Sequence, residues 1–479
     1  MNLTAKEHQN FLIFISFVAF LRLLLSAFVG LGVDEAHYVL YALNLDLSYF
    51  DHPPLVGWIQ YLFTSVFGSG EFGSRVAAII IGFMTSVFIY RLVYDIGKNA
   101  SHAFIAVLAL HASFLFNALF IMLMPDTLLF LLLLPIIFTT VAIEKYNQRS
   151  MWILLAILLG LAGLSKYTAV LFVVPIILYF ILKKRYQFFY SLNILITIVI
   201  SLAIISPVII WNIQNDWSSF AYQSEHVVGK SGIGWSGFFS SIAAQIGAYN
   251  PFLFPLAFYG LYKAFRSKND TLFLSSLFGL VLIAFFTYAS LYKTALPHWS
   301  ALFYMLFIPI GSYYLLQSFK PALKYLKFSI GFGLILSTLA YAELGFKFLP
   351  LPDYQSLHRD IYGWDTIMKK ANAQLTDTKT QAIAVTNWTL ASRAIYYNRG
   401  YNSSVYLIDD RSDQFDIWEH DSAIGKDLLI INTHFFQKDI AKYMQCDAVI
   451  TNSSFDIILN QHKVNTITLS RCKNFQGLR

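Results

Sequence analysis

The 479-residue sequence has few charged residues and almost no cysteine. Only 13% of its residues are Asp, Glu, Lys or Arg, whereas soluble domains carry about a quarter. Hydrophobic residues make up 57% of the chain and aromatic residues 17%, so we expect lipid to surround most of it. The only two cysteines, Cys446 and Cys472, both lie near the C-terminal end.

Several familiar motifs are missing as well. The sequence has no Walker A loop and no dinucleotide-binding glycine fingerprint, which argues against an enzyme driven by nucleotide binding. It has no CxxC or HExxH metal motif either. It has no internal repeat and no low-complexity linker. The net charge of +7 does not indicate nucleic-acid binding, because the basic residues form short clusters between apolar runs.

Apolar runs dominate the first 350 residues and predict about eleven transmembrane helices. The predicted spans are 11–31, 73–93, 102–122, 127–143, 152–164, 168–182, 188–210, 238–262, 272–290, 299–316 and 328–346. Two of them, 152–164 and 168–182, are too short to cross alone, and Gly163, Ser165 and Lys166 lie between them. We therefore expect one broken pair. The first run lacks a small-residue cleavage site, so no cleavable signal peptide is expected.

The basic residues of the loops predict the orientation. With the N-terminus inside, the inner loops carry Arg91, Lys98, Lys145, Arg149, Lys183, Lys184, Arg185, Lys263, Arg266, Lys268, Lys320, Lys324 and Lys327. The outer loops before the tail carry only Arg75, Lys166, Lys230 and Lys293. The tail is therefore predicted to lie on the non-cytoplasmic side.

This pattern predicts a polytopic α-helical membrane domain over 1–349 and a non-cytoplasmic α/β domain over 350–479. In the tail, short strands are expected at 382–386, 404–408, 427–432, 448–451 and 464–469, and helices at 364–375, 388–397 and 437–445. The outer loop 32–72 has apolar residues at helical spacing, which predicts two helices along the membrane interface.

Two acidic strings in this outer loop are candidates for chemistry. Asp34 and Glu35 directly follow the first span, with His37 and Tyr38 on the same helical turn. A carboxylate pair beside a membrane is costly and often functional, although the same pair could merely cap a helix. In the second string, Pro-Pro follows Asp51 and His52 and fixes them at a rigid corner, the alternative being a plain turn.

Further candidate site residues lie outside this loop, and some of them also have a purely structural interpretation. Asp126 opens the fourth span, where an N-cap is the routine role, and Lys166 could be an interface anchor. Glu225, His226 and Lys230 share the second outer loop. Arg22 lies within the first span and needs a partner or a wet cavity.

These strings resemble the bacterial GT-C glycosyltransferases, the relatives of lipid A aminoarabinose transferases and protein O-mannosyltransferases. The resemblance is carried by Asp34-Glu35-Ala36-His37-Tyr38 and by Leu47-Ser48-Tyr49-Phe50-Asp51-His52-Pro53-Pro54-Leu55-Val56-Gly57-Trp58. Gly160–Thr168, Ser206–Asn212 and parts of the tail, including Gln414–Trp418, agree with it. Asp51-His52 stands where the aminoarabinose branch has Glu-Lys, and Lys230 is the nearest cation where that branch has an Arg, which leaves the sugar open.

The resemblance implies that a sugar is transferred from a polyprenyl-phosphate carrier with inversion at the anomeric carbon. It assigns the catalytic acids to Asp34, Asp51 and Asp126, with Asp34 as the best candidate base. Groups that could hold the donor phosphate are His37, His52, Lys166 and Lys230, and the predicted site also includes Glu35, Tyr38, Glu225 and His226. No nucleotide or redox cofactor is expected, because a phosphate ester already leaves well. A divalent metal ion stays an alternative, with Glu225 and His226 as conceivable ligands.

The sequence thus predicts an inverting glycosyltransferase of the bacterial inner membrane, acting on lipid A or another glycan or lipid at the periplasmic face. A protein O-mannosyltransferase, a transporter or flippase of lipid-linked sugars, and a non-catalytic scaffold remain alternatives. Transporters tend to place ionisable residues at mid-membrane in repeated halves, and only Arg22 fits that pattern. Cys446 and Cys472, on the predicted oxidising side, could form a disulfide.

Overall fold

The computed structural model describes residues 3–228, 233–318, 320–349, 351, 356, 358–419 and 421–479. It divides into two compact units, and each is described by itself. The membrane unit comprises Met1–Leu23, Asp46–Ile59 and Arg75–Thr338. The mixed unit comprises Leu24–Leu45, Gln60–Ser74 and Leu339–Arg479, so parts of the first outer loop belong with the C-terminal residues. The domain boundary at residue 350 stays a prediction.

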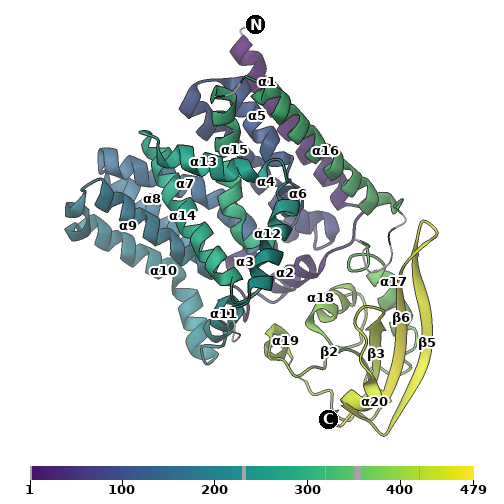
Figure 1. The fold of residues 1–479 in the computed structure, drawn as a ribbon. Helices are drawn as coiled ribbons and strands as arrows, with labels where there is room; N and C mark the ends of the chain where they lie inside the picture. Colours follow the sequence, from purple (N-terminus) through teal and green to yellow (C-terminus); the bar gives the residue numbers. More distant parts are fainter. Residues whose placement is uncertain are drawn as a thin grey trace. The chain divides into compact units, whose positions relative to one another are not determined.

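Helices make up the chain up to residue 346 (Figure 1). They are α1 (Leu3–Ser26), α2 (Val33–Leu43), α3 (Leu55–Phe67), α4 (Glu71–Gly97), α5 (Ala100–His111), α6 (Phe114–Leu119), α7 (Pro125–Tyr146), α8 (Arg149–Ser165), η1 (Tyr167–Phe172), α9 (Val173–Leu182), η2 (Tyr186–Tyr190), α10 (Leu192–Gln214), α11 (Ser218–Val228), α12 (Trp235–Ala248), α13 (Phe254–Phe265), α14 (Asp270–Ser290), η3 (Pro297–Ser300), α15 (Ala301–Ser318) and α16 (Ala322–Phe346).

Seven described helices are long and apolar enough to cross a membrane. In the most apolar 18-residue window of the stretch that ends in α15, 78% of the residues are buried inside the protein. In the corresponding window of α10, only 17% of the residues are buried. An apolar helix with so little protein cover must face lipid. The polytopic membrane fold predicted from composition is therefore confirmed.

The predicted broken pair is confirmed, and two further breaks were not predicted. Helix α8 ends at Ser165, and Lys166 is extended (φ −154°, ψ 138°) before η1. The predicted span 102–122 is wrong as a single helix, because it divides into α5 and α6. The Asn117 side chain donates hydrogen bonds to the backbone oxygens of His111 and Ser113 at this break. Side-chain donors of this kind satisfy backbone groups that lipid cannot.

The predicted span 238–262 is also wrong as one helix, because α12 ends at Ala248 and α13 starts at Phe254. Asn250 lies between them with a positive φ of 69° and is followed by Pro251. A residue before proline avoids the helical region, and Asn tolerates the left-handed one. The fully buried Asn250 side chain donates to the backbone oxygens of Ala112 and Ser329, which ties this break to the first.

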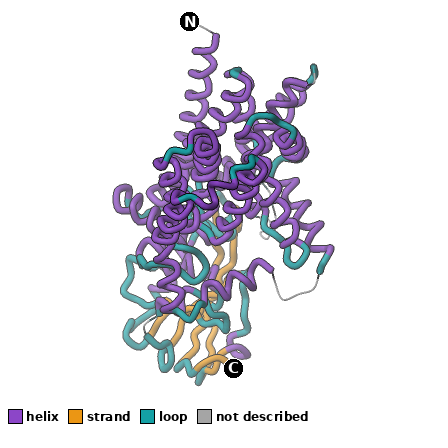
Figure 2. Tube along the Cα trace, turned by 90° about the vertical axis from the view of Figure 1, so that its left-hand side faces the viewer, coloured by secondary structure: helices purple, strands orange, loops and turns teal. Residues whose placement is uncertain are grey.

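The C-terminal residues alternate strands and helices, and Figure 2 shows the strands gathered in this part of the described chain. The elements are α17 (Trp364–Asn372), β1 (Gln381–Val385), α18 (Trp388–Tyr397), β2 (Val405–Leu407), α19 (Gln414–Trp418), β3 (Asp427–Thr433), α20 (Ile440–Tyr443), β4 (Met444–Gln445), β5 (Ala448–Leu459), β6 (His462–Lys473) and β7 (Gly477–Leu478). The predicted α/β class is confirmed. Two expectations are wrong in length: β5 and β6 form a longer hairpin, and the predicted helix 437–445 shrinks to α20.

The main sheet has the order β2-β1-β3-β6-β5, parallel in its first three strands and antiparallel at β6 and β5. One face of this sheet is covered by α17, α18 and also α2, whose Ala36, Val39 and Leu40 belong to the same buried core as Trp364 and Ala391. Cys446 and Cys472 are joined in a disulfide with Cα atoms 5.4 Å apart, which confirms the proposed bridge.

Candidate active site

Asp126 and Lys166 form the most buried ion pair of the membrane unit among those described. Lys166 Nζ lies 2.7 Å from each carboxylate oxygen of Asp126, and the two side chains are 12% and 5% exposed. Helix α7 places Asp126 in its first turn, and the extended break after α8 directs Lys166 to it. The Ser165 hydroxyl, which donates to the backbone oxygen of Pro125, holds the two helix ends together.

Two histidines lie near this ion pair and interact electrostatically with Asp126. His52 and His298 are both near enough for their charges to act on Asp126. His52 follows Asp51 in the Pro-Pro corner, and the corner closes by a hydrogen bond from the Tyr49 N–H to the backbone oxygen of His52 (3.1 Å). The membrane unit therefore brings together Asp51, His52, Asp126 and Lys166, four of the predicted site residues.

Tyr167, which was not predicted, connects this polar cluster to its surroundings. Its hydroxyl lies 2.6 Å from the Oγ of the fully buried Ser219, and the charge of Asp51 acts on it. Tyr167 directly follows Lys166, so one segment supplies both the ion pair and this phenol. A tyrosine at the end of an apolar run gives no distinguishing signal in a sequence so rich in tyrosine.

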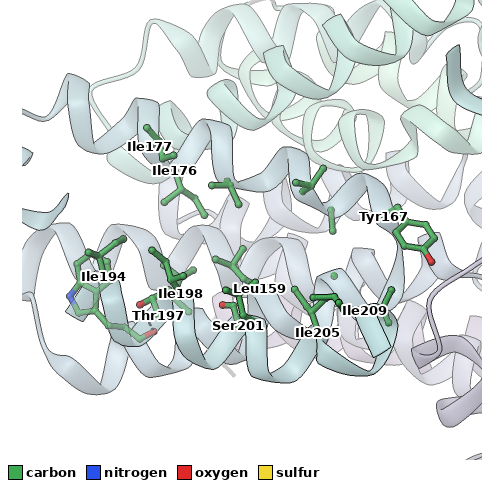
Figure 3. A pocket seen from close by; sticks show the side chains of 18 of the residues that line it. Leu159, Tyr167, Ile176, Ile177, Ile194, Thr197, Ile198, Ser201, Ile205 and Ile209 are labelled. Carbon is green, nitrogen blue, oxygen red and sulfur yellow. Dashed lines mark hydrogen bonds between the residues drawn. The ribbon is translucent and has the colours of Figure 1, made fainter. Parts of the chain in front are cut away.

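An apolar groove of about 920 Å³ ends at Tyr167. Helices α8, α9 and α10, η1 and the start of α11 form its walls, and isoleucine, leucine and valine dominate its lining. Figure 3 shows Tyr167 at one end of this groove and Ile194 at the other, with Ile198 and Ile205 between them. The groove is a lipid-like environment that terminates beside a charged cluster.

Asp46 is a second site residue that was not predicted. Its Oδ2 accepts a hydrogen bond from the indole of Trp211 (2.8 Å), and its backbone oxygen accepts one from the indole of Trp58 (3.0 Å). Gln223 donates to the backbone oxygen of Asp51. These bonds fasten the loop that carries Asp51 and His52 to α3, α10 and α11.

The mixed unit contains two other predicted acids, Asp34 and Glu35. Asp34 is half-buried in the first turn of α2, and the buried Glu35 closes a capping box by accepting a hydrogen bond from the Gly32 N–H (2.9 Å). Carboxylates in a first turn are favoured by the helix dipole. Glu35 thus has a structural role, whereas Asp34 is the more exposed acid.

His37 and Tyr38 are almost completely buried on the same helix, with 4% and 3% exposed. The His37 ring lies within about 6 Å of the rings of Tyr41, Trp388, Phe415 and Trp418, and its Nδ1 is 3.2 Å from the Ser392 hydroxyl. This environment joins α2 to α18 and α19.

An acidic group lies at the start of α19. Asp413 caps this helix by accepting a hydrogen bond from the Phe415 N–H (2.8 Å), and the residue is 6% exposed. Burial raises the pKa of Asp413 to about 7, with the nearby Asp409 and Asp416 adding to the effect. Burial likewise raises the pKa of Glu419. The charge of His37 acts on Asp413.

The remaining predictions concern residues elsewhere. Glu225 is exposed on α11, while the His226 side chain and the whole of Lys230 lie outside the described residues. Within the described ranges, no group of three or more His, Cys, Asp or Glu side chains could hold a metal ion. Arg22 is buried and donates to Asn117 Oδ1 (2.9 Å), with His111 Nδ1 at 3.3 Å, so protein groups surround this intramembrane cation.

Comparison with known proteins agrees with this arrangement. Residues 51–211, which include Asp51, Asp126 and Lys166, match the family model of dolichyl-phosphate-mannose-protein mannosyltransferase. The lipid A galacturonosyltransferase RgtD of Rhizobium johnstonii is 22% identical over 421 residues, covering 83% of this chain and 84% of that protein.

Solved structures match over nearly the whole length. The crystal structure of ArnT from Cupriavidus metallidurans bound to undecaprenyl phosphate has a TM-score of 0.65 at 14% identity, covering 96% of this chain and 97% of that one. Its apo form gives the same score over 97% and 98%. The chain has the fold of the GT-C glycosyltransferases. The fold class and the enzyme class, a glycosyltransferase, that the two acidic strings predict are thus confirmed. The chain is a multi-pass membrane protein.

Proposed function

We propose that this GT-C enzyme transfers a sugar from a polyprenyl-phosphate carrier to lipid A or a related envelope glycolipid, at the periplasmic face of the bacterial inner membrane. The observation that carries the proposal is the groove that ends at Tyr167, beside Asp51 and the Asp126–Lys166 pair. Its lining suits an isoprenoid chain, and the polar end suits a phosphate and a sugar. RgtD acts on lipid A and one ArnT structure holds undecaprenyl phosphate, which supports the same substrate classes here.

In the proposed reaction, an acceptor hydroxyl oxygen attacks the anomeric carbon while the bond from that carbon to the phosphate oxygen breaks. Asp34 takes the hydroxyl proton, and the polyprenyl phosphate leaves with the bonding electrons, which inverts the anomeric carbon. Asp34 suits the base because it is half-exposed, unlike Glu35, whose carboxylate is used in the capping box. Asp51 stays a proposed catalytic acid of the membrane unit.

The charges of the membrane unit suggest how the leaving phosphate is held. The charge of Lys166 is already balanced by Asp126 at 2.7 Å. We therefore propose that Lys166 supports the structure and the electrostatic field of the site and does not bind the phosphate directly. His52, half-exposed in the corner, is the better phosphate donor of the described residues. Lys230 stays a proposed second donor. We assign His37 to holding α2, because aromatic rings enclose it.

A transfer assay with purified full-length protein in liposomes tests this function. Undecaprenyl-phosphate-linked galacturonic acid, aminoarabinose and mannose are offered with lipid A or an acceptor peptide, and wild type is compared with Asp34→Asn. Wild type should transfer one sugar to lipid A, while the variant loses roughly 10²–10⁴-fold in rate and keeps donor binding. Full activity of the variant would exclude Asp34 as base.

The same assay separates the alternatives. Mannosyl transfer to the peptide alone would favour a protein O-mannosyltransferase, the reaction named in the matching family model. Sugar-lipid translocation without transfer would favour a flippase. The one residue that suggested transport, Arg22, is enclosed by Asn117 and His111 near the α5–α6 break, which fits a structural role.

A further inference from the structure

The turn between α10 and α11 has two different faces. We define it as the elbow, residues 208–223. One face lines the apolar groove with Val208, Trp217 and Phe220. These side chains come from the end of α10 and the start of α11, so a lipid chain that fills the groove must press on the elbow itself.

The other face of the elbow holds the corner that carries Asp51 and His52. The indole of Trp211 donates to Asp46 Oδ2 at 2.8 Å, and Gln223 donates to the backbone oxygen of Asp51. The ring of Tyr222 lies 4.9 Å from that of Phe50, the residue before Asp51. Three separate contacts therefore join the elbow to this acidic loop.

The elbow is internally braced. Its fully buried Asn212 accepts hydrogen bonds from the Trp217 N–H at the backbone oxygen (2.7 Å) and from the Phe220 N–H at Oδ1 (3.3 Å). Two consecutive residues, Asp216 and Trp217, have positive φ angles of 52° and 58°. Residues other than glycine hold this conformation only when their surroundings impose it. A braced element of this kind transmits displacement from one face to the other.

We propose that the elbow couples occupancy of the carrier groove to the position of Asp51 and His52, with Trp211 and Gln223 as positioning residues. The proposal rests on the proposed function, since it assumes that an isoprenoid chain fills the groove. Binding energy from a remote part of a substrate can be used to order the reacting groups, in which case a truncated substrate loses kcat and not only affinity. The carrier chain would thus activate transfer of the sugar that it carries.

The test compares two donors that differ only in chain length, the undecaprenyl-phosphate sugar accepted in the transfer assay and its geranyl analogue, on full-length enzyme. Wild type should show a kcat at least about 10-fold higher with the long chain. In Trp211→Phe, which removes the indole donor but keeps an aromatic ring, and in Gln223→Ala, the long-chain kcat should fall until this ratio approaches unity.

Ile198→Ala is the matched control, because Ile198 lines the groove and lies outside the elbow. It should raise KM for the long donor and leave the kcat ratio high. A wild-type kcat independent of chain length would overturn the coupling. An equal loss of the ratio in Ile198→Ala and Trp211→Phe at unchanged thermal stability would also overturn it. Absence of transfer from either donor would instead overturn the proposed function.

Discussion

Lys166 Nζ lies 2.7 Å from both carboxylate oxygens of Asp126, at the end of an apolar groove. The two residues are 40 positions apart: Asp126 lies in the first turn of α7, and Lys166 lies in the break between α8 and η1. The pair fixes the polar end of the groove without presenting a net charge of its own.

Removing one partner of this pair should be worse than removing both. Lys166→Met leaves the buried Asp126 carboxylate without its cation, which we expect to lower the free energy of unfolding by about 3–5 kcal/mol. The double variant Asp126→Asn/Lys166→Met should recover most of that stability and remain inactive. Thermal unfolding in detergent measures both, with the exposed Lys268→Met as a control expected to change stability by less than about 0.5 kcal/mol. Additive losses in the double variant would contradict a coupled pair.

Stability of the mixed unit should depend on pH through Asp413. Its pKa is raised to about 7 in the folded protein, against about 3.9 in an unfolded chain, so the folded state holds the proton more tightly. The stabilisation from this bound proton is fully present below about pH 4 and is lost as the pH rises to about 7. Over that range the free energy of unfolding falls by up to about 1.4 kcal/mol per pH unit.

Asp413→Asn should therefore lose this part of the slope while keeping the helix cap, since Asn caps as well as Asp. The melting temperature of the two proteins between pH 5 and pH 8.5 provides the measurement. Asp377→Asn, an exposed loop carboxylate, should retain the wild-type slope. Identical slopes in wild type and Asp413→Asn would show that this carboxyl group does not control the effect.

The disulfide should be present in protein extracted without reductant. We expect Cys446 and Cys472 to resist alkylation until a reductant is added, as judged by mass spectrometry. The double variant Cys446→Ser/Cys472→Ser should cost about 2–4 kcal/mol, because the bond closes a loop with a sequence separation of 26. Two freely reacting thiols in the non-reduced protein would reject the bridge.

Deleting residues 350–479 should abolish transfer while the membrane spans still insert. The deletion removes Trp364, Leu390 and Ala391, which share a buried core with Ala36 and Leu40 of α2. The helix that carries Asp34 would then expose its apolar face. Ala391→Leu, which overpacks the same core, offers a milder version expected to cost about 1–3 kcal/mol. A truncated protein with the wild-type transfer rate would show that α2 does not need this core.

Local patterns were sufficient for much of this structure. The predicted helix 388–397 is α18, Trp388–Tyr397, because an Asn N-cap and an amphipathic repeat define it within its own sequence. The break at Lys166 was also visible, since glycine and a charge interrupt an apolar run. The Asp34 and Asp51 strings identified the enzyme class.

Other features depend on contacts that the local pattern does not contain. The break between α5 and α6 has no proline or glycine, and it is stabilised by Asn117 from α6 and by the distant Asn250 side chain. The Asn250-Pro251 turn signal was present but was outweighed by the apolar run around it. Asp46 is one of several polar residues in its loop, and only its pairing with the Trp211 indole, 165 residues away, distinguishes it.

The packing of α2 also has a consequence for biosynthesis. A ribosome makes this helix directly after the first span, whereas Trp364, Leu390 and Ala391 emerge only after α16, the last of the candidate spans. Asp34 therefore lies on a helix that lacks its packing partners until the remaining spans have been made. We therefore expect a chain that lacks its C-terminal residues to be inactive even when its spans are in the membrane. The order of synthesis thus delays activity until the C-terminal residues have folded against α2.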